Sequence, residues 1–232
     1  MTTRIAALNI RHGGSKCAGA LATRLLGYDA DIVVVTEFRA DGTGVRLKLH
    51  LAAAGYTTSH PDTDPKHNST LIASRHGVTR ARAFADDVEA RHLWCAETAG
   101  VVLCAVYLPQ KVAELRYLQA VVRDARASGI DVLVGDFNTG NNDLDKEPQG
   151  AGFIGSEMPG RLIGSGYLDV WRSRHPATRE YLWFSRPGDD GFRLDHLYAS
   201  PELAHRVSLC EFDHAPRLAG ETDHSALVTE LG

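Results

Sequence analysis

Short apolar runs that end abruptly at a polar residue recur along this chain. The clearest occupies residues 132–134 and leads directly into Gly135, Asp136 and Asn138. A run of this length that is bounded by glycine predicts a buried strand stopping at that glycine. Because Asp136 and Asn138 are two positions apart, their side chains are expected on the same side of the strand end. A carboxylate beside an amide can hold a metal ion, a water molecule or a phosphate oxygen.

The same arrangement recurs at four other places in the chain. Apolar runs lead into Asn9 and Glu37, an apolar segment follows Asp195, and another follows residues 222–225 (Thr-Asp-His-Ser). Each motif alone has an ordinary structural explanation, since Asp and Asn also begin many loops. Five of them at strand ends favour one shared site. Oxygen ligands without cysteine suit a hard cation such as Mg²⁺ or Mn²⁺ better than Zn²⁺.

The rest of the chain alternates between helical and strand-like patterns. Helical spacing of apolar residues predicts helices at 18–26, 47–54 and about 113–127, and strand-like runs occupy 69–74, 93–97 and 101–106. Residues 139–166 are rich in Gly, Pro, Asn and Asp and predict a long loop with one helical turn at most. Long ordered loops in compact domains are often functional, and this one directly follows Asn138.

Composition narrows the class of protein. A chain of 232 residues without a linker, repeat or low-complexity block predicts a single domain, 1–232. The N-terminus lacks an apolar signal region, and no stretch approaches a membrane span. The four cysteines are scattered without a Cys-x-x-Cys pair, which is typical of reduced thiols. We therefore expect a cytoplasmic protein that does not associate with a membrane; nothing in the pattern specifies an oligomeric state.

Taken in chain order, the polar motifs resemble those of the endonuclease/exonuclease/phosphatase superfamily. The resemblance runs from Asn9 and Glu37 through residues 135–138 and Asp195 to residues 222–225, so it covers nearly the whole chain. Three stretches, 106–110, 143–145 and 169–200, look most similar to exonuclease III-type AP endonucleases. The resemblance implies an α+β fold of the DNase I type. This fold is a four-layer αββα sandwich, in which two mainly antiparallel β-sheets are flanked by helices on both outer faces.

The resemblance also implies a divalent metal ion and its ligands. Glu37 would be the principal carboxylate ligand of Mg²⁺, with Mn²⁺ as the alternative, and Asn9 and Asp223 would assist it. An all-oxygen ligand set of this kind matches the preference of a hard cation.

The remaining motif residues would act on a phosphodiester. Asp136 would orient or deprotonate the attacking water, and Asn138 would hold that water or the phosphate. His224 would stabilise the transition state while Asp195 fixes its tautomer, and Tyr107 would donate to the scissile phosphate. Tyr107 also has a simpler interpretation as a half-buried strand aromatic.

Four further residues are candidates for substrate binding. Asn68 corresponds to a phosphate-binding residue of the superfamily, although an ordinary turn asparagine is an equal alternative. Leu182, Phe192 and Leu194 lie where AP endonucleases form a small apolar pocket for a flipped abasic sugar. These apolar residues favour DNA as the substrate and DNA repair as the setting.

Other polar and aromatic residues have structural interpretations. Asp169 is expected to cap a helix or to pair with Arg172, and Trp171 and Trp183 are expected in the core. Basic residues near the motifs, including Arg193, could form a local rim for phosphates, but a solvated charged surface is the simpler reading for most of them.

Several features of the sequence leave the identity of the substrate undetermined. Thr36 stands where a Gln usually precedes the catalytic Glu, Arg11 follows Asn9 by two positions, and the segment after Gln110 is short. The net charge of −4 gives no overall positive field. A metal-dependent DNA nuclease or AP endonuclease is the leading hypothesis. The alternative is a phosphatase or phosphodiesterase acting on a small phosphorylated molecule. A catalytically silent binding protein is disfavoured, because every core motif residue is present.

Overall fold

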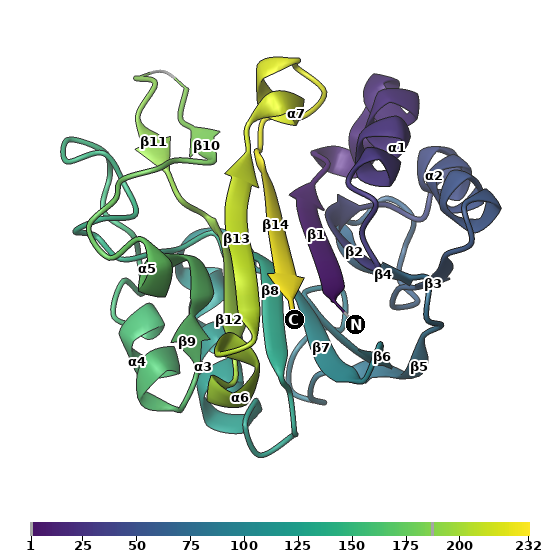
Figure 1. Ribbon diagram of the computed structural model, residues 1–232. Coiled ribbons are helices and arrows are strands. Elements are labelled where there is room, and N and C mark those ends of the chain that lie inside the picture. Colours follow the sequence, from purple (N-terminus) through teal and green to yellow (C-terminus); the bar gives the residue numbers. More distant parts are fainter. Residues whose placement is uncertain (1, 187) are drawn as a thin grey trace.

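A computed structural model, which describes residues 2–186 and 188–232, contains two six-stranded β-sheets packed face to face (Figure 1). The first sheet consists, in spatial order, of β13 (Val207–Asp213), β14 (Ala226–Leu231), β1 (Thr3–Asn9), β2 (Ile32–Phe38), β4 (Ser69–Ser74) and β3 (Thr57–Ser59). The second consists of β5 (Thr79–Ala83), β6 (Leu93–Thr98), β7 (Val101–Tyr107), β8 (Val132–Asp136), β12 (Asp195–Ala199) and β9 (Leu168–Asp169). Only β1 with β2 and β7 with β8 pair in parallel within these sheets, so the predicted, mainly antiparallel arrangement is confirmed.

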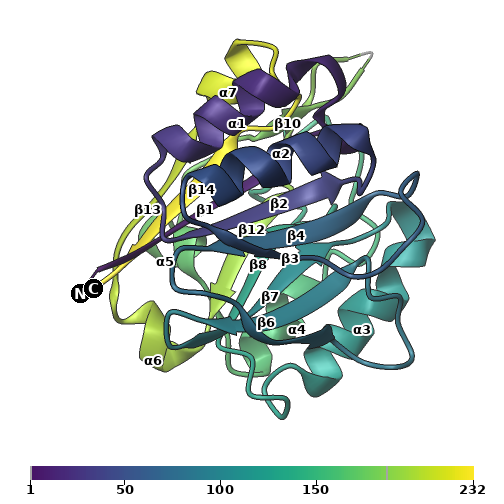
Figure 2. The same cartoon turned by 90° about the vertical axis from the view of Figure 1, so that its right-hand side faces the viewer.

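Helices cover the outer face of each sheet (Figure 2). The longer ones are α1 (Ala18–Gly27) and α2 (Gly42–Ala53) on the first sheet and α3 (Glu114–Asp124) and α4 (Met158–Gly164) on the second. Shorter elements are α5 (Val170–Arg174), α6 (Pro201–Ala204), α7 (Ala215–Leu218), the 3₁₀ helices η1 (His12–Cys17) and η2 (Lys111–Ala113), and the hairpin of β10 (Trp183–Phe184) and β11 (Gly191–Phe192). The four-layer fold implied by the sequence is therefore confirmed.

The alternation of side chains along the strands explains the layers. In β1, Ile5 and Ala7 point into the core between the sheets, where they join Val134 of β8. Ala6 and its neighbours of the same parity pack instead against the helices, including Leu21 of α1. Both faces of these central strands are therefore buried. For this reason their sequences are continuously apolar and do not alternate between apolar and polar residues.

The predicted elements match the structure most closely at strands and least at helix ends. Strand 69–74 agrees at both ends, whereas α2 begins at Gly42, five residues before the predicted start. The early start follows from Asp41, whose Oδ1 accepts hydrogen bonds from the backbone N–H groups of Thr43 and Gly44 at 2.8 and 3.1 Å. This N-cap satisfies two donors at the start of the helix. The long loop carries α4, so it holds more helix than the single turn expected.

A buried ion cluster fixes the long loop against the second sheet. Arg193 is 1% exposed and pairs with Asp145 at 2.8 Å and with Asp169 at 2.6 Å. The reading of Arg193 as a solvated surface charge was therefore wrong, because the loop brings two carboxylates to it. Asp169 also accepts a hydrogen bond from the backbone N–H of Arg172 at 3.0 Å, so its predicted role as a helix cap is confirmed.

The described residues contain no disulfide and no membrane-spanning helix. Cys95 and Cys104 face each other across β6 and β7, and both are free and buried. None of the helices in residues 2–186 and 188–232 combines the length and the apolar character needed to cross a bilayer.

Candidate active site

The polar motifs meet at one edge of the two packed sheets. β1, β2, β7 and β8 all end at this edge, where β12 and β14 begin. The register places Asp136 beside Tyr107 on one side and Asp195 on the other. The β10–β11 hairpin and α7 rise above the sheets at this end (Figure 1). The first and last motifs are joined directly, since the hydroxyl of Thr222 donates to the backbone carbonyl of Asn9 at 2.7 Å.

Asn9 links the two sheets. Its side chain is fully buried, and Nδ2 donates to Asp136 Oδ2 at 2.9 Å and to Glu37 Oε1 at 3.3 Å. The amide oxygen accepts a hydrogen bond from the backbone N–H of Arg11 at 2.9 Å. One asparagine thus holds the proposed metal carboxylate and the proposed base in fixed positions relative to each other.

Glu37 occupies a strained position at the end of β2. Its φ of 55° lies in the left-handed region, and the pairing of β2 with β4 shifts register between Thr36 and Phe38. A non-glycine residue adopts this conformation at an energetic cost, and such residues cluster at functional sites. Oε2 of Glu37 accepts hydrogen bonds from the backbone N–H of His12 at 2.7 Å and from Asn68 Nδ2 at 2.9 Å.

Asp136 is a buried carboxylate surrounded by amide donors. Besides Asn9, the backbone N–H of Asn138 donates to it at 2.9 Å and the side chain of Asn138 at 3.2 Å. Burial, reinforced by the negative charge of Asp195, raises the pKa of Asp136 to about 8. A carboxylate with this pKa is a stronger base than an ordinary aspartate, and its ionised, basic form predominates above about pH 8.

His224 and Asp195 form a buried pair. Nδ1 of His224 donates to Asp195 Oδ2 at 2.8 Å. Burial alone would lower the pKa of His224, but the charge of Asp195 and this hydrogen bond outweigh it and raise the pKa to about 9. His224 is therefore an imidazolium at neutral pH. With Nδ1 occupied, Nε2 is the nitrogen left to donate to a substrate.

Tyr107 is connected to Glu37 through Asn68. Asn68 Nδ2 donates to the Tyr107 hydroxyl oxygen at 3.1 Å, while Arg39 Nε donates to Asn68 Oδ1 at 2.7 Å. Burial raises the pKa of Tyr107 well above its ordinary value, so the phenol stays protonated. Because Asn68 donates to the phenol oxygen, the phenol proton remains available for another acceptor.

Asp223 and His12 lie at the edge of the cluster. Within the described residues, the carboxylate of Asp223 accepts from Trp183 Nε1 at 3.3 Å and pairs with Arg11 at 3.5 Å; neither Asn9 nor Glu37 is among its partners. His12, which the sequence did not distinguish from other histidines, places Nδ1 3.0 Å from Glu37 Oε2. No local pattern marks His12, since the turn that follows β1 brings it there.

A small cavity adjoins Asn138. It has a volume of about 220 Å³, and among its lining residues are Phe192 and Leu194, as the sequence predicts for a sugar pocket. Leu182 does not line this cavity, because it is fully buried beneath the hairpin and its backbone N–H donates to the carbonyl of Phe192. Trp183 was expected in the core, but it is only partly buried and lines the cavity beside Phe192, with ring centroids 5.8 Å apart.

The sequence model of the endonuclease/exonuclease/phosphatase family matches residues 6–224 of this chain. The chain belongs to that family. The family unites enzymes that hydrolyse phosphoric esters, which places the protein among hydrolytic nucleases and phosphatases.

Solved structures support the same fold. An AP endonuclease from Archaeoglobus fulgidus is 22% identical with a TM-score of 0.84 and 98% of each chain covered. A 3′ phosphatase, NExo, from Neisseria, bound to a product DNA hairpin, is 22% identical with a TM-score of 0.85 and 99% of each chain covered. A 3′-5′ exonuclease, also NExo, from Neisseria meningitidis is 22% identical with a TM-score of 0.83 and 99% of each chain covered. The resemblance to exonuclease III-type AP endonucleases is thus confirmed at the level of fold.

The donor set of this family member fits a magnesium ion better than zinc. No three Asp, Glu, His or Cys side chains form a metal cage within residues 2–186 and 188–232. Mg²⁺ does not need one, because it keeps several waters and binds through one or two carboxylates. While Oε2 of Glu37 accepts two hydrogen bonds at 2.9 Å or less, Oε1 accepts the long one from Asn9 at 3.3 Å. Oε1 is therefore the oxygen best placed to take a cation.

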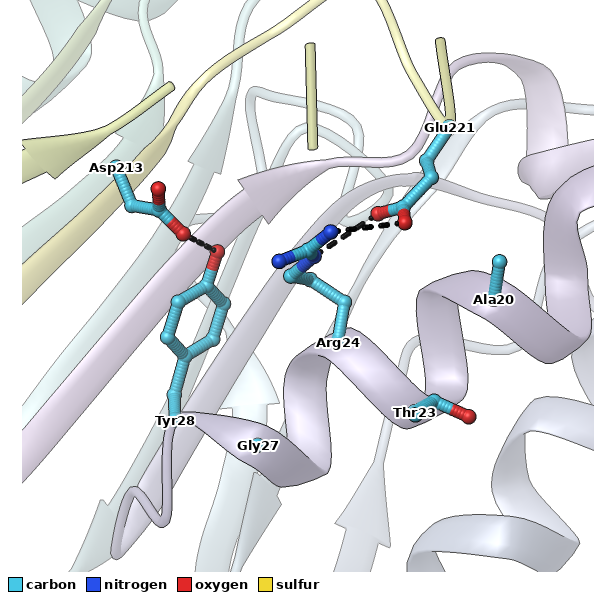
Figure 3. Close-up of a pocket in the computed structure, with 7 residues that line it drawn as sticks. All are labelled: Ala20, Thr23, Arg24, Gly27, Tyr28, Asp213 and Glu221. Carbon is cyan, nitrogen blue, oxygen red and sulfur yellow. Dashed lines mark hydrogen bonds and ion pairs between the residues drawn. The ribbon is translucent and has the colours of Figure 1, made fainter. Parts of the chain in front are cut away.

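A separate hollow of about 550 Å³ lies between α1 and the segments around Asp213 and Glu221 (Figure 3). Its charged groups point toward one another across the hollow. Arg24 donates to both carboxylate oxygens of Glu221, at 3.0 and 2.9 Å, and the Tyr28 hydroxyl donates to Asp213 at 2.8 Å. Because these groups are paired with one another, we interpret the hollow as a structural link between the first helix and the segment that leads into the Thr222 motif.

Proposed function

We propose that this protein is a divalent-metal-dependent hydrolase that cleaves phosphodiester bonds in DNA, with an abasic site as its preferred target. The observation that carries the proposal is the convergence at one sheet edge of Glu37 and Asn9, the buried base Asp136 and the donor His224, next to a small apolar cavity. A phosphodiester is anionic and has a poor leaving group, so its hydrolysis needs these components together.

The metal ion belongs to the proposal. Glu37 and Asn9 would hold Mg²⁺, or Mn²⁺, with Asp223 as a further ligand, and the bound ion would supply Lewis-acid stabilisation of charge on the phosphate. Of these three, Asn9 donates from Nδ2 to Glu37, so it would bind the ion through Oδ1, which accepts from the backbone N–H of Arg11. Asp223 is instead held by Trp183 and Arg11. Asp223 would have to exchange at least the ion pair with Arg11 to reach the ion.

The protein side chains divide the proton chemistry between them. Asp136 would take the proton of the attacking water, which Asn138 helps to position. His224 would donate from Nε2, and Tyr107 from its hydroxyl, to oxygens of the phosphate. Asp195 would keep the imidazolium oriented and charged throughout the reaction.

DNA is supported by the cavity and by the comparisons. Phe192, Leu194 and Trp183 give the cavity an apolar wall that could enclose a sugar from which the base is missing. Lys111 lines the same cavity, and Arg11 is exposed beside Asp223, so positive charges flank the site for phosphates. The Neisseria 3′ phosphatase was solved with a product DNA hairpin, and it shares this fold along its whole length.

A small phosphorylated molecule is the alternative substrate. It is favoured by the net charge of −4, because a protein without an overall positive field gains little long-range attraction for DNA. It is also favoured by the short connection η2 between β7 and α3, which offers little surface to a duplex.

A substrate screen separates the two proposals. The purified protein would be assayed with Mg²⁺ or with EDTA on abasic duplex, intact duplex, RNA and a set of phosphorylated metabolites. We expect Mg²⁺-dependent cleavage that is fastest on the abasic duplex and is lost in EDTA. Turnover of metabolites without cleavage of any nucleic acid would establish the alternative, and equal rates in EDTA would contradict both.

A further inference from the structure

A buried carboxyl group lies in the wall of the small cavity. Glu114, the first residue of α3, is 1% exposed and lines the cavity together with Asn138, Trp183 and Phe192. Its Oε2 is buried and has no hydrogen-bond partner within residues 2–186 and 188–232. Buried polar atoms are nearly always hydrogen-bonded, so this oxygen needs a partner, and a ligand in the adjoining cavity can supply one.

The burial of Glu114 favours the neutral acid. Burial, with a contribution from the negative charge of Asp136, raises the pKa of Glu114 to about 8. A protonated carboxyl carries one donor and retains acceptor capacity, so it can both give and take a hydrogen bond. The matching group on a ligand is a hydroxyl, which has the same dual capacity.

The size and walls of the cavity limit what can enter. A volume of about 220 Å³ is below the roughly 300 Å³ at which pockets for drug-sized ligands begin. The rings of Phe153 and Trp183 pack against Phe192, with centroids 5.6 and 5.8 Å away. These aromatic walls suit an uncharged group of the size of one sugar. Asn138 lines the same cavity, so a sugar there would lie next to the proposed catalytic groups.

We propose that Glu114 hydrogen-bonds to a hydroxyl group of the sugar held in this cavity, and that it thereby makes the enzyme prefer abasic sugars that carry a hydroxyl at C1′. This inference rests on the proposed function, because it presumes that an abasic nucleotide occupies the cavity. It adds a polar determinant of specificity to a pocket whose other expected contacts, Phe192 and Leu194, are apolar.

An alternative explanation is that Glu114 only stabilises the start of α3. A negative charge in the first turn of a helix interacts favourably with the helix dipole. That role requires an ionised carboxylate and is independent of the substrate. The two explanations therefore differ in what a neutral replacement does to stability and to substrate preference.

The test compares two substrates that differ by one hydroxyl. Duplexes containing a natural abasic site or its tetrahydrofuran analogue, which lacks the C1′ hydroxyl, would be cleaved by wild type, Glu114→Gln and Glu114→Met. We expect wild type to prefer the natural site in kcat/KM by about tenfold, the magnitude of one net hydrogen bond. Glu114→Gln, which keeps a donor and an acceptor, should retain most of the preference, and Glu114→Met should abolish it.

Thermal unfolding of the same variants gives a second readout. Replacing an unpartnered buried carboxyl by the apolar Met should raise the midpoint of unfolding, whereas a helix-stabilising carboxylate would lower it when removed. If the methionine variant does not fold, Glu114→Leu takes its place.

The possible failures are distinguishable. An unchanged substrate ratio in a folded Met or Leu variant, with Mg²⁺-dependent cleavage of both duplexes intact, would overturn the role of Glu114 alone. No cleavage of either duplex by wild type would overturn the proposed function, and this inference with it.

Discussion

Single side chains of the site are each held from more than one strand. Asn9 bridges the two sheets through Glu37 and Asp136, and His224 is oriented by Asp195 from a different strand. Locking a catalytic group in this way places its reactive atom without further rearrangement. Because the side chains hold one another in place, the contribution of one residue to the rate depends on whether its neighbour is present.

The pair of His224 and Asp195 gives the clearest prediction at this scale. If Asp195 acts through His224, the losses caused by His224→Ala and Asp195→Ala should overlap in the double variant and not multiply. Single-turnover rates on abasic duplex would be measured for all three variants. We expect the double variant to be no more than a few times slower than the slower single variant.

A matched control is Asp87→Asn, which removes an exposed carboxylate that partners Arg123 outside the site. It should leave the turnover rate unchanged. Rate losses that multiply cleanly in the double variant would show that His224 and Asp195 act independently.

The sequence pattern identifies those site residues that directly adjoin an apolar run. It does not identify residues that reach the site only through contacts between segments distant in sequence. Asn9, Glu37 and Asp136 end strands, so the pattern alone marks them. Glu114 begins an amphipathic helix and looks like an ordinary solvated glutamate, yet packing of α3 buries it. His12 gives no signal, because its approach to Glu37 depends on a turn with positive φ angles at residues 11–15.

At the level of elements, the long loop after β8 is fixed by buried charges. Asp145 in this loop pairs with Arg193, which also pairs with Asp169 at the start of α5. Burial alone would raise the pKa of Asp169, but the charge and hydrogen bonds of Arg193 outweigh it and hold the pKa well below its usual range. The loop therefore depends on ionised carboxylates for its position next to the site.

The free energy of unfolding should report this cluster. Since the pKa of Asp169 is lower in the folded protein than in the unfolded chain, its contribution is fully present above about pH 4 and is lost as pH falls below that value. Arg193→Met should lower the free energy of unfolding at pH 7 by about 3 to 5 kcal/mol, because the buried Asp169 loses its arginine partner and Asp145 keeps only Arg172. In the variant, acidification toward pH 4 should recover part of this loss. Urea unfolding of wild type and variant at pH 7, pH 4.5 and about pH 3 measures these effects.

The control for this experiment is Arg123→Met. Arg123 pairs with Asp87 and Asp124 on the surface, so its removal should change the free energy of unfolding little. Equal effects of the two substitutions would contradict the role assigned to the buried cluster.

Strands were more predictable than helix starts and loops, for a physical reason. Central strands such as β2 and β8 are buried on both faces, so their sequences are continuously apolar and end sharply. The start of α2 depends on one capping side chain, Asp41, and the hairpin that carries Trp183 depends on contacts distant in sequence. Neither feature produces a periodic pattern of apolar residues in the sequence.

For the whole molecule, the pairing of β1 with β14 brings the two ends of the chain together (Figures 1 and 2). This closes the site, because the first motif residue, Asn9, ends β1 and the last motif, residues 222–225, directly precedes β14. Two sheets that share one core carry this edge, and the cavity lies beside it, lined by residues of η2, the loop after β8 and the β10–β11 hairpin. The sequence resemblance predicted the fold and pointed to Phe192 and Leu194 as pocket residues, whereas the positions of Trp183 and Glu114 in the cavity wall became visible only in the structure.

The central claim is that Glu37 holds a catalytic divalent metal ion. Its most direct test is calorimetric titration of Mg²⁺ into wild type and Glu37→Gln, together with single-turnover cleavage of abasic duplex. Glu97→Gln, which changes a surface carboxylate paired with Arg80 at the end of the second sheet opposite the site, is the matched control. We predict that Glu37→Gln keeps the wild-type circular dichroism spectrum, binds Mg²⁺ measurably more weakly and cleaves at least about a hundredfold more slowly. Wild-type Mg²⁺ affinity and full turnover in Glu37→Gln, or full turnover of the wild type in EDTA, would contradict the account.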